Sequence, residues 1–430
     1  MGAVKRLARV LERVEQNTAA SVFLRRDDAR LYDLARVSDA RRKAGVSLGP
    51  LDGQVVVIKG NIDVRGLPTT AGSRSFGAPT ATECAPLVRQ LVDAGALPMG
   101  HANMSEFAFS GLGTNPHFGT PPNGLNADLV PGGSSSGCAS AIALGIADMA
   151  VGTDTSGSVR VPAAYQGIIG FRPTLGRYDN RGILPLAPAL DTPGPMARNM
   201  QTITYLDQAM RLTAPSKTVP PVHRHVVLPT AADLGCLSPE IETLLDDVCR
   251  QLQNEGWRVQ RRPIPVLPAV RALFAQYGTL VAAQARISLG SYTRLDNPRL
   301  DPNVRVRLDA ARQISTADIA ALTDARPRLQ AQLRDQLDGA VMILPTVPDL
   351  PPRLDMIADQ TGFARHNARA LSLTMLGAFL DMPALALPCG QGLPGYSLTI
   401  TAPQGTDDVV LNTGTALEPL LSRTNQVISA

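Results

Sequence analysis

Hydrophobic residues along this chain follow two spacings. Leu7, Val10, Leu11 and Val14 recur at i, i+3, i+4 and i+7, which predicts an amphipathic N-terminal helix. The same reasoning predicts helices at residues 86–94, 138–144, 201–212 and 238–256 and over most of 265–340. Short apolar runs predict buried strands at residues 54–58, 97–100, 148–151, 340–344, 382–390 and 397–401. This alternation of helices and strands indicates an α/β protein.

Residues 131–162 break the pattern, because small residues replace most large apolar and charged side chains there. The stretch reads PGGSSSGCASAIALGIADMAVGTDTSGSVRVP. Two loops, 132–137 and 152–158, are crowded with glycines and hydroxyls and flank the predicted helix 138–144 and strand 148–151. Both loops can therefore fold back onto one spot, where glycines let successive N–H groups converge on a single oxygen. An oxyanion hole is built in this way.

Three other interpretations of these loops fit less well. A Ser/Gly linker would lack the apolar strand and the Ala-rich helix between the loops. A phosphate cradle would be followed by Gly-Lys-Ser/Thr, or would show G-x-G-x-x-G at a strand-to-helix turn. A nucleophile elbow centred on Ser135 would need a strand directly before it, and residues 129–131 are a poor strand end. The elbow match is formal rather than physical.

One lysine stands out as a candidate base. The chain has four lysines, and only Lys59 follows an apolar strand. A buried lysine can lose its proton near neutral pH, whereas an arginine cannot. The alternative is a strand-end lysine that reaches water, but the two hydroxyl loops favour a base. His101 and His117 have no acidic partner at a recognisable spacing, so we expect them to be surface or loop hydrogen-bonding groups.

The hydroxyl loops and their flanks resemble the signature segment of the amidase signature family, the Ser-Ser-Lys amide hydrolases. The matching residues are 131–135, 152–154, 157–160 and 170–174, and Ser134 and Ser158 lie 158 − 134 = 24 positions apart, as in the family. Residues 51–75 resemble the family segment that carries the lysine, and the resemblance extends strongly over 50–205 and weakly over 335–420.

The resemblance implies one large domain, 1–430, with a central mixed sheet surrounded by helices. Within it we expect a signature core at 50–205, a variable helical region at 206–335 that shapes the substrate pocket, and closing strands and helices at 336–430. Candidate pocket residues in the helical region are Tyr277, Arg286, Tyr292 and Arg294.

The resemblance also implies the roles of the site residues. Ser158 would be the nucleophile, neutral Lys59 the base, and Ser134, preceded by a cis peptide, the proton relay. The oxyanion would be bound by the main-chain N–H groups of Thr155, Ser156, Gly157 and Ser158. Two departures from the family are Gly60 after the lysine, where Asp or Asn is usual, and Ser156, where Gly is common. Asn61 and Asp63 are near enough in sequence to approach Lys59.

The implied activity is hydrolysis of a carboxamide-type C–N bond through a serine acyl-enzyme, which releases ammonia or an amine. The alternatives are a glutaminase-type subunit of a tRNA-dependent amidotransferase and a hydrolase of ureido or carbamoyl compounds. A non-enzymatic binding protein with the same fold is a further alternative, but the intact Lys59, Ser134 and Ser158 argue against it.

The amino-acid composition limits the classes of binding partner that we expect for this protein. The net charge is +4, from 41 basic and 37 acidic residues with no long basic run, which gives a nucleic-acid role no support. No run of about 18 apolar residues and no secretory leader is visible, so we expect a cytoplasmic protein without a membrane partner. The five cysteines form no C-x-x-C pair, and we expect reduced thiols, no metal and no cofactor. The expected partner is a small-molecule amide, and a homodimer stays open.

Overall fold

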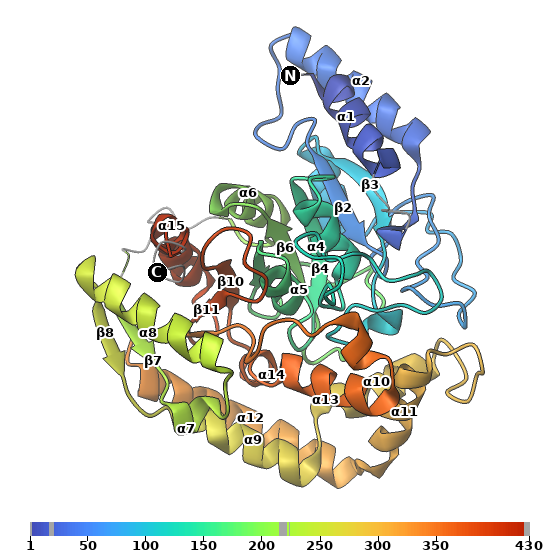
Figure 1. Cartoon of the computed structure of the whole chain (residues 1–430). Coiled ribbons are helices and arrows are strands. Elements are labelled where there is room, and N and C mark those ends of the chain that lie inside the picture. Colours follow the sequence, from blue (N-terminus) through green and yellow to red (C-terminus); the bar gives the residue numbers. More distant parts are fainter. Residues whose placement is uncertain (1, 17–20, 215–221, 223, 425–430) are drawn as a thin grey trace.

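A mixed eleven-stranded sheet forms the centre of the protein (Figure 1). The computed structural model describes residues 2–16, 21–214, 222 and 224–424. The strands lie in the order β1-β3-β2-β4-β6-β5-β10-β11-β9-β7-β8. Their bounds are β1 Phe23–Arg25, β2 Val55–Lys59, β3 Leu97–Ala102, β4 Met149–Asp154, β5 Ile169–Arg172, β6 Thr192–Ala197, β7 His225–Leu228, β8 Arg258–Arg261, β9 Val341–Pro345, β10 Ala384–Pro388 and β11 Ser397–Thr401. The β2–β3, β2–β4, β7–β8 and β7–β9 neighbours are parallel, and the other pairs are antiparallel.

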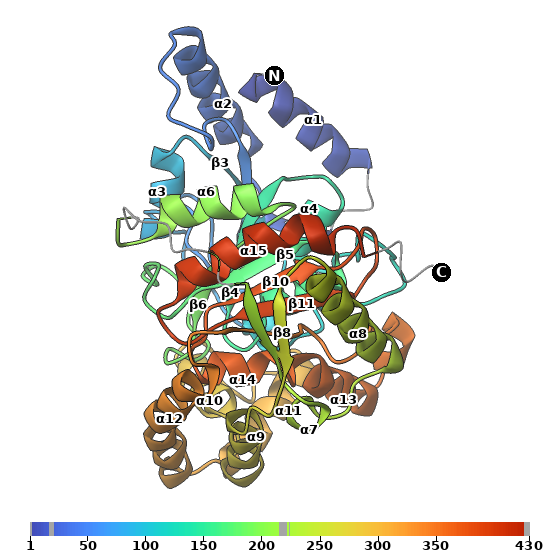
Figure 2. The ribbon, with the colours of Figure 1, turned by 90° about the vertical axis from the view of Figure 1, so that its left-hand side faces the viewer.

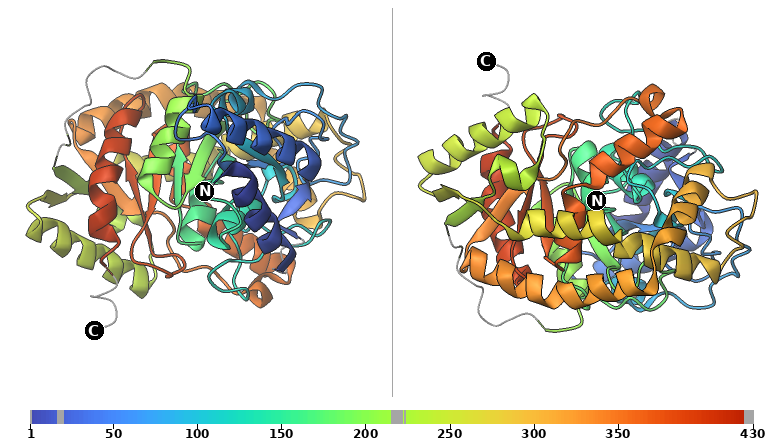
Figure 3. Two further views of the ribbon diagram at one scale, coloured as in Figure 1. Left: turned by 90° about the horizontal axis from the view of Figure 1, so that it is seen from above. Right: turned by 90° about the horizontal axis from the view of Figure 1, so that it is seen from below.

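Helices surround the sheet, so the protein is the single-domain α/β structure that the sequence predicted. The helices are α1 Ala3–Gln16, α2 Asp28–Lys43, α3 Pro86–Asp93, α4 Ser136–Ala143, α5 Arg160–Tyr165, α6 Met200–Met210, α7 Ala231–Leu234, α8 Pro239–Asn254, α9 Val266–Tyr277, α10 Leu280–Gly290, α11 Pro302–Ala310, α12 Thr316–Leu337, α13 Gln360–Leu371, α14 Thr374–Phe379 and α15 Asp407–Leu421. Helices α6 and α15 cross one face of the sheet (Figure 2). The pair α1 and α2 lies at one end of the molecule, and α9 and α12 run along the other end (Figures 1 and 3).

Successive residues of β10 show how the two faces of the sheet are filled. Neighbouring side chains of a strand point to opposite faces. Leu385 packs in the same cluster as Leu411 of α15, whereas Ala386 packs in the cluster that contains Cys138 of α4 and Ala163 of α5. The two hydroxyl loops lie at the starts of α4 and α5, so this small-residue packing sets their positions relative to the sheet.

Most predicted elements are present with bounds that differ by one or two residues, and two further differences have structural consequences. The sequence suggested a loop from residue 152, but strand β4 continues through Asp154. The strand is longer because β6 pairs with it as far as Asp154↔Thr192. The polar, proline-rich run at residues 216–226 predicts a connector between elements. It lies mostly outside the described residues, but its end at His225 and Val226 is already strand β7. This part of the connector prediction was wrong.

In the described ranges, no single helix is long and apolar enough to cross a membrane. The two helices α9 and α10, which are bent by 49° at their junction, satisfy the length and composition criteria together.

Candidate active site

Lys59 lies at the carboxyl end of β2, where the neighbouring parallel strand β4 also ends. In the β2–β4 pair, Val57 lies opposite Ala150 and Ile58 opposite Val151, so Lys59 and Thr153 reach the same edge. The Lys59 Nζ atom is 2.7 Å from Ser134 Oγ, 2.7 Å from Thr153 Oγ1 and 3.2 Å from the Thr153 carbonyl oxygen. The polar end of this lysine is therefore held by three oxygens inside the protein.

Burial makes the Lys59 ammonium group a stronger acid than an ordinary lysine, so the neutral amine forms near pH 7. Its side chain is fully buried, and this desolvation lowers its pKa from 10.5 to about 7, against the smaller opposing effects of Cys138, Asp154 and Asp191. A neutral amine donates two hydrogen bonds and accepts one. The two Thr153 oxygens can accept, and the Ser134 hydroxyl can donate its proton to the nitrogen lone pair. The geometry is thus compatible with a neutral lysine that receives a proton from Ser134.

The first hydroxyl loop lies directly beside this lysine. The Gly133–Ser134 peptide bond is cis, which confirms that implication of the family resemblance. The Ser135 N–H donates to the Ser158 carbonyl oxygen at 3.1 Å and joins the two loops. Ser135 is fully buried and is not preceded by a strand, and its Oγ donates to the Thr153 carbonyl oxygen at 3.4 Å. The precondition for a nucleophile elbow at Ser135 is therefore missing.

The second hydroxyl loop wraps around the Asp154 carboxylate. That carboxylate accepts from the N–H groups of Gly157 at 2.7 Å and Val159 at 3.1 Å, and from the Arg160 guanidinium at 3.0 Å on each oxygen. Burial alone would raise the pKa of Asp154, but Arg160, Arg172 and the main-chain donors lower it below its usual value. The Asp154 carboxylate therefore fixes the backbone before and after Ser158.

Gly157 is required where the loop meets α14. Its φ is +139°, and a Cβ there would lie 2.2 Å from Thr374 Oγ1. The Thr374 hydroxyl donates to the Ser156 carbonyl oxygen at 2.6 Å. Ser156, where the family commonly has glycine, is thus held through its main chain by a residue more than 200 positions away.

The four expected oxyanion donors differ in whether their N–H groups already have a hydrogen-bond acceptor. The Gly157 N–H is already donated to Asp154, whereas the N–H groups of Thr155, Ser156 and Ser158 donate to no residue in the described part of the chain. The Thr155 hydroxyl donates to Asp191 Oδ1 at 2.5 Å, which orients the start of the loop. Three of the four N–H groups consequently have no hydrogen-bond acceptor among the described residues.

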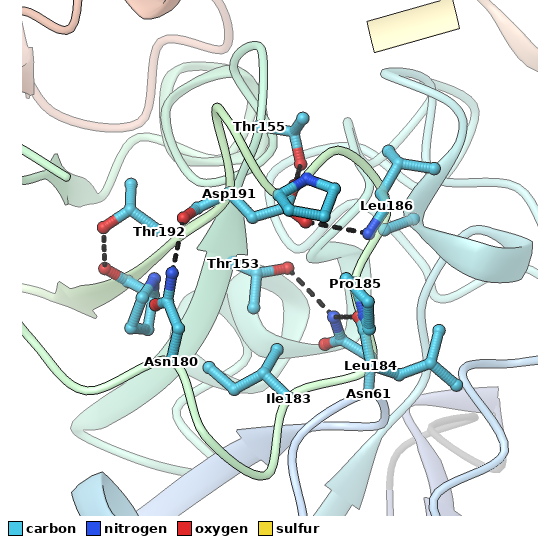
Figure 4. Close-up of a pocket in the computed structure, with 13 residues that line it drawn as sticks. Asn61, Thr153, Thr155, Asn180, Ile183, Leu184, Pro185, Leu186, Asp191 and Thr192 are labelled. Atoms are coloured by element: carbon cyan, nitrogen blue, oxygen red, sulfur yellow. Dashed lines mark hydrogen bonds between the residues drawn. The ribbon is translucent and has the colours of Figure 1, made fainter. Parts of the chain in front are cut away.

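A cavity of about 300 Å³ opens beside Thr153 and Thr155 (Figure 4). Its lining residues are Asn61, Ala108, Thr153, Thr155, Asn180, Ile183, Leu184, Pro185, Leu186, Pro188, Asp191, Thr192 and Pro193. Asn61 reaches the lysine network because its Nδ2 donates to Thr153 Oγ1 at 3.3 Å. The cavity therefore lies beside the hydrogen-bond network of Lys59 and the start of the loop that carries Ser158, but Lys59, Ser134 and Ser158 are not among its lining residues.

None of the four residues expected in the pocket wall lines this cavity. Tyr292 and Tyr277 line two other cavities, and Arg294 is exposed and paired with Asp296. The helical region instead holds the loop whose residues line the cavity. Gln284 accepts from the Ala189 N–H at 3.0 Å, and Arg326 donates to the Ala189 carbonyl oxygen at 3.0 Å.

The two histidines considered from the sequence, His101 and His117, make their contacts outside the two hydroxyl loops. His101 is buried in β3 rather than on the surface, and its Nε2 lies 2.8 Å from the Ile62 carbonyl oxygen, while burial lowers its pKa to about 4. His117 does have an acidic neighbour, because its Nε2 is 3.1 Å from Glu106 Oε1. Neither histidine hydrogen-bonds to a serine of the two hydroxyl loops within the described residues.

Residues after Lys59 also differ from the expectation. Asp63 accepts from Thr69 Oγ1 at 2.6 Å instead of approaching the lysine. Gly60 has no room for a side chain, because a Cβ would lie 2.5 Å from Leu24 Cδ1 and 3.0 Å from the Ala102 carbonyl oxygen. The departure from the family at Gly60 is thus a matter of packing.

Thr153, Asp154, Asp191 and Thr374 are residues of the site whose contacts were not predicted from the sequence. The first two lie in the Gly-Thr-Asp segment that carries the resemblance, which was the available signal. Asp191 and Thr374 reach the site from 36 and 218 positions away, and no local pattern marks them.

Comparison with known proteins places the chain in a family. The family profile described as Amidase matches residues 3–411. The chain is 32% identical to 2-amino-5-chloromuconic acid deaminase from Comamonas testosteroni, over 94% of this chain and 89% of that protein, and 30% identical to mandelamide hydrolase from Pseudomonas putida, over 96% and 87%. A crystal structure of an amidase superposes with a TM-score of 0.88 and 28% identity over 98% of this chain and 96% of the other. The chain therefore belongs to the amidase family and is a hydrolase of carbon–nitrogen amide bonds.

Proposed function

We propose that Ser158, Ser134 and Lys59 form the catalytic set of this amidase. The observation that carries the proposal is the 2.7 Å contact between Lys59 Nζ and Ser134 Oγ, made by a fully buried lysine whose pKa is lowered to about 7. A base of this kind can take up a proton at neutral pH, and the relay hydroxyl lies within hydrogen-bond distance of it.

The reaction then proceeds in two balanced halves. Ser158 Oγ attacks the amide carbonyl carbon while its proton passes to Ser134 Oγ, and the Ser134 proton passes to Lys59 Nζ. The free N–H groups of Thr155, Ser156 and Ser158 bind the oxyanion. Lys59 returns the proton through Ser134 to the leaving nitrogen, the C–N bond breaks, and ammonia or an amine departs. Water then attacks the acyl-serine by the same proton route, so the sum is amide plus water giving carboxylic acid plus amine.

The pH dependence of activity tests the base. Because Lys59 must be neutral to accept a proton, kcat/KM should fall on the acid side and rise with pH through an apparent pKa of about 7. The measurement is kcat/KM for a non-ionising amide between about pH 5 and pH 10. An acid limb that lies near the ordinary lysine pKa of 10.5 would contradict a buried neutral base.

Ser134→Ala tests the relay through the leaving group. An amine leaves only with help from a proton, whereas an alkoxide needs less help, so the variant should lose roughly 10²–10⁴-fold in kcat/KM for an amide and much less for the matched ester. Ser136→Ala is the matched control, because the buried Ser136 hydroxyl has no hydrogen-bond partner among the described residues. Equal losses on amide and ester would leave Ser134 only a positioning role.

The amidotransferase alternative is separated by a simpler measurement. An isolated glutaminase-type subunit would need its complex for activity, whereas the proposed amidase acts alone. Release of ammonia from simple amides by the purified chain supports the amidase, and release that appears only with added partner subunits supports the alternative.

A further inference from the structure

The helical region after residue 206 contains a cavity of its own, which we call the Arg307 cavity. Its volume is about 460 Å³. Its lining residues are Phe109, Gln276, Tyr277, Gly278, Thr279, Ala282, Arg307, Ala310, Ala311, Gln313, Ile314 and Asp318. Apart from Phe109, they belong to residues 276–318, where α10 contacts both α11 and α12 (Figure 1). The lining shares no residue with the cavity beside Thr153 and Thr155.

Arg307 brings a positive charge to this cavity without a carboxylate partner. Its guanidinium lies over the Phe109 ring, 3.8 Å from the ring centroid, and its Nη1 donates to the Phe109 carbonyl oxygen. Within the described residues, no aspartate or glutamate forms an ion pair with Arg307, and its remaining N–H groups have no acceptor. Burial lowers the pKa of Arg307 to about 10. The guanidinium is therefore charged at neutral pH and lacks a counter-charge.

Two fully buried arginines of this protein are balanced by carboxylates. Arg160 pairs with Asp154 at 3.0 Å, and Arg172 lies 3.5 Å from Asp381. Desolvating a guanidinium without a counter-charge costs free energy, and a bound anion would offset part of that cost. Arg307, which is half-buried, is thus suited to pair with the anionic group of a ligand.

The acid in the lining, Asp318, belongs to a helix cap. Its Oδ2 accepts from the hydroxyl and the main-chain N–H of Ser315 at 2.7 and 2.8 Å, at the start of α12. These hydrogen bonds hold the pKa of Asp318 below its usual value, so this carboxylate is ionised at neutral pH. Among the described ion pairs, none joins Asp318 to Arg307. Because Asp318 repels a second negative charge, a ligand with a single charge is favoured over a phosphate dianion.

The other lining residues suit an organic acid. The apolar part of the lining consists of Phe109, Ala282, Ala310, Ala311 and Ile314. The side chains of Gln276, Tyr277 and Gln313 make no hydrogen bond to the described residues and can donate to a ligand oxygen. A volume of about 460 Å³ is sufficient for a ligand with one ring. The cavity therefore combines a cation, neutral donors and an apolar wall.

A ligand in the Arg307 cavity would contact a segment that also borders the candidate active site. Phe109 follows Ala108, which lines the cavity described above. The Gly111 carbonyl oxygen accepts from the Gly133 N–H at 2.7 Å. This segment thus contacts both the Arg307 cavity and the first hydroxyl loop.

We infer that the Arg307 cavity binds an organic carboxylate that carries one ring-sized apolar group. The carboxylate pairs with the free N–H groups of the guanidinium, and the apolar group lies along Phe109 and Ile314. The site is additional to the proposed catalytic set, because none of the three catalytic residues lines this cavity. Its test therefore requires no turnover.

Calorimetric titration with phenylacetate tests this site. At about pH 7.5, phenylacetate should bind the wild-type protein at least about tenfold more tightly than 2-phenylethanol, which has the same ring and no charge. Arg307→Gln should remove this preference. Arg305→Gln is the matched control, because Arg305 lies on the same helix, α11, and does not line the cavity. The inference is overturned if phenylacetate does not bind the wild-type protein, if the preference persists in Arg307→Gln, or if Arg305→Gln removes it equally.

Photolabelling locates the site without any substitution, so it also decides the question if Arg307→Gln does not fold. We expect 4-azidophenylacetate to label Phe109 or residues between 276 and 318, as located by peptide mass mapping, and excess phenylacetate to prevent this labelling. Label elsewhere, for example in residues 180–193 of the cavity beside Thr153 and Thr155, would overturn the inference. Label that excess phenylacetate does not prevent would also overturn it, because such labelling involves no specific site.

Discussion

Ser158→Ala is expected to lower kcat for amide hydrolysis by roughly 10⁴–10⁶-fold and to leave the protein folded. Loss of a nucleophile in a serine hydrolase costs about this much, because the remaining groups cannot form the acyl-enzyme. Ser158 is almost fully buried and the change removes one oxygen, so little packing is lost. Steady-state kinetics, with folding checked by circular dichroism, measures the effect. A fluorophosphonate should label Ser158 in the wild-type protein, as located by peptide mass mapping.

Ser135→Ala is the matched control for this prediction. Ser135 lies in the other hydroxyl loop, and its hydroxyl donates at 3.4 Å to the Thr153 carbonyl oxygen. This hydrogen bond has no role in the proposed proton transfers. We expect a much smaller loss of kcat and an unchanged label on Ser158. Label on Ser135, or a loss in Ser135→Ala as large as in Ser158→Ala, would transfer the nucleophile to the first loop.

The sequence was most informative where a single strand or loop carries the signal. A β-branched run that ends on a lysine predicted β2 and the candidate base, and the five residues of β2 are all buried as expected. Strands β9, β10 and β11 were predicted for the same reason. The two hydroxyl loops were recognisable because glycines and hydroxyls gathered around a predicted helix and strand.

Strands with weak patterns were harder to predict. Strand β6 has the sequence TPGPMA, in which glycine and prolines hide the strand, and its pairing with β4 and β5 comes from the fold. This pairing also extends β4 through Asp154. The local sequence around residue 152 could not show that a partner strand lies beside it.

Contacts between distant segments could not be predicted where neither the hydroxyl loops nor the family resemblance marks them. The helical region at 206–335 was expected to shape the substrate pocket, whereas the cavity beside Thr153 and Thr155 is lined mostly by residues between 180 and 193. Helices of that region hold the 180–193 loop through Gln284 and Arg326. A periodic pattern predicts that these helices exist, but it does not show which of their polar residues face the site.

Lys59→Met should remove activity and, at acid pH, raise stability. Methionine has a similar length and no proton acceptor, so we expect kcat to fall by at least about 10³-fold. The buried lysine itself opposes folding, since its pKa is 10.5 in the unfolded chain and about 7 in the folded protein. That cost is fully present below pH 7 and is lost as the pH rises toward 10.5. The stability of the variant relative to the wild type should therefore fall by about 3 kcal/mol between pH 6.5 and pH 9.5.

Urea unfolding of both proteins at the two pH values measures this difference. The loss of the hydrogen bonds to Ser134 and Thr153 lowers the free energy of unfolding of the variant at both pH values, so it cancels in the difference. Lys43→Met is the matched control, because Lys43 lies exposed in the last turn of α2. Its stability relative to the wild type should change little with pH. If Lys59→Met behaves like Lys43→Met in unfolding, Lys59 is charged in the folded protein at neutral pH. If it also keeps substantial turnover, another group is the base. A catalytic lysine requires both effects together, because the desolvation that makes Lys59 a base is the same one that opposes folding.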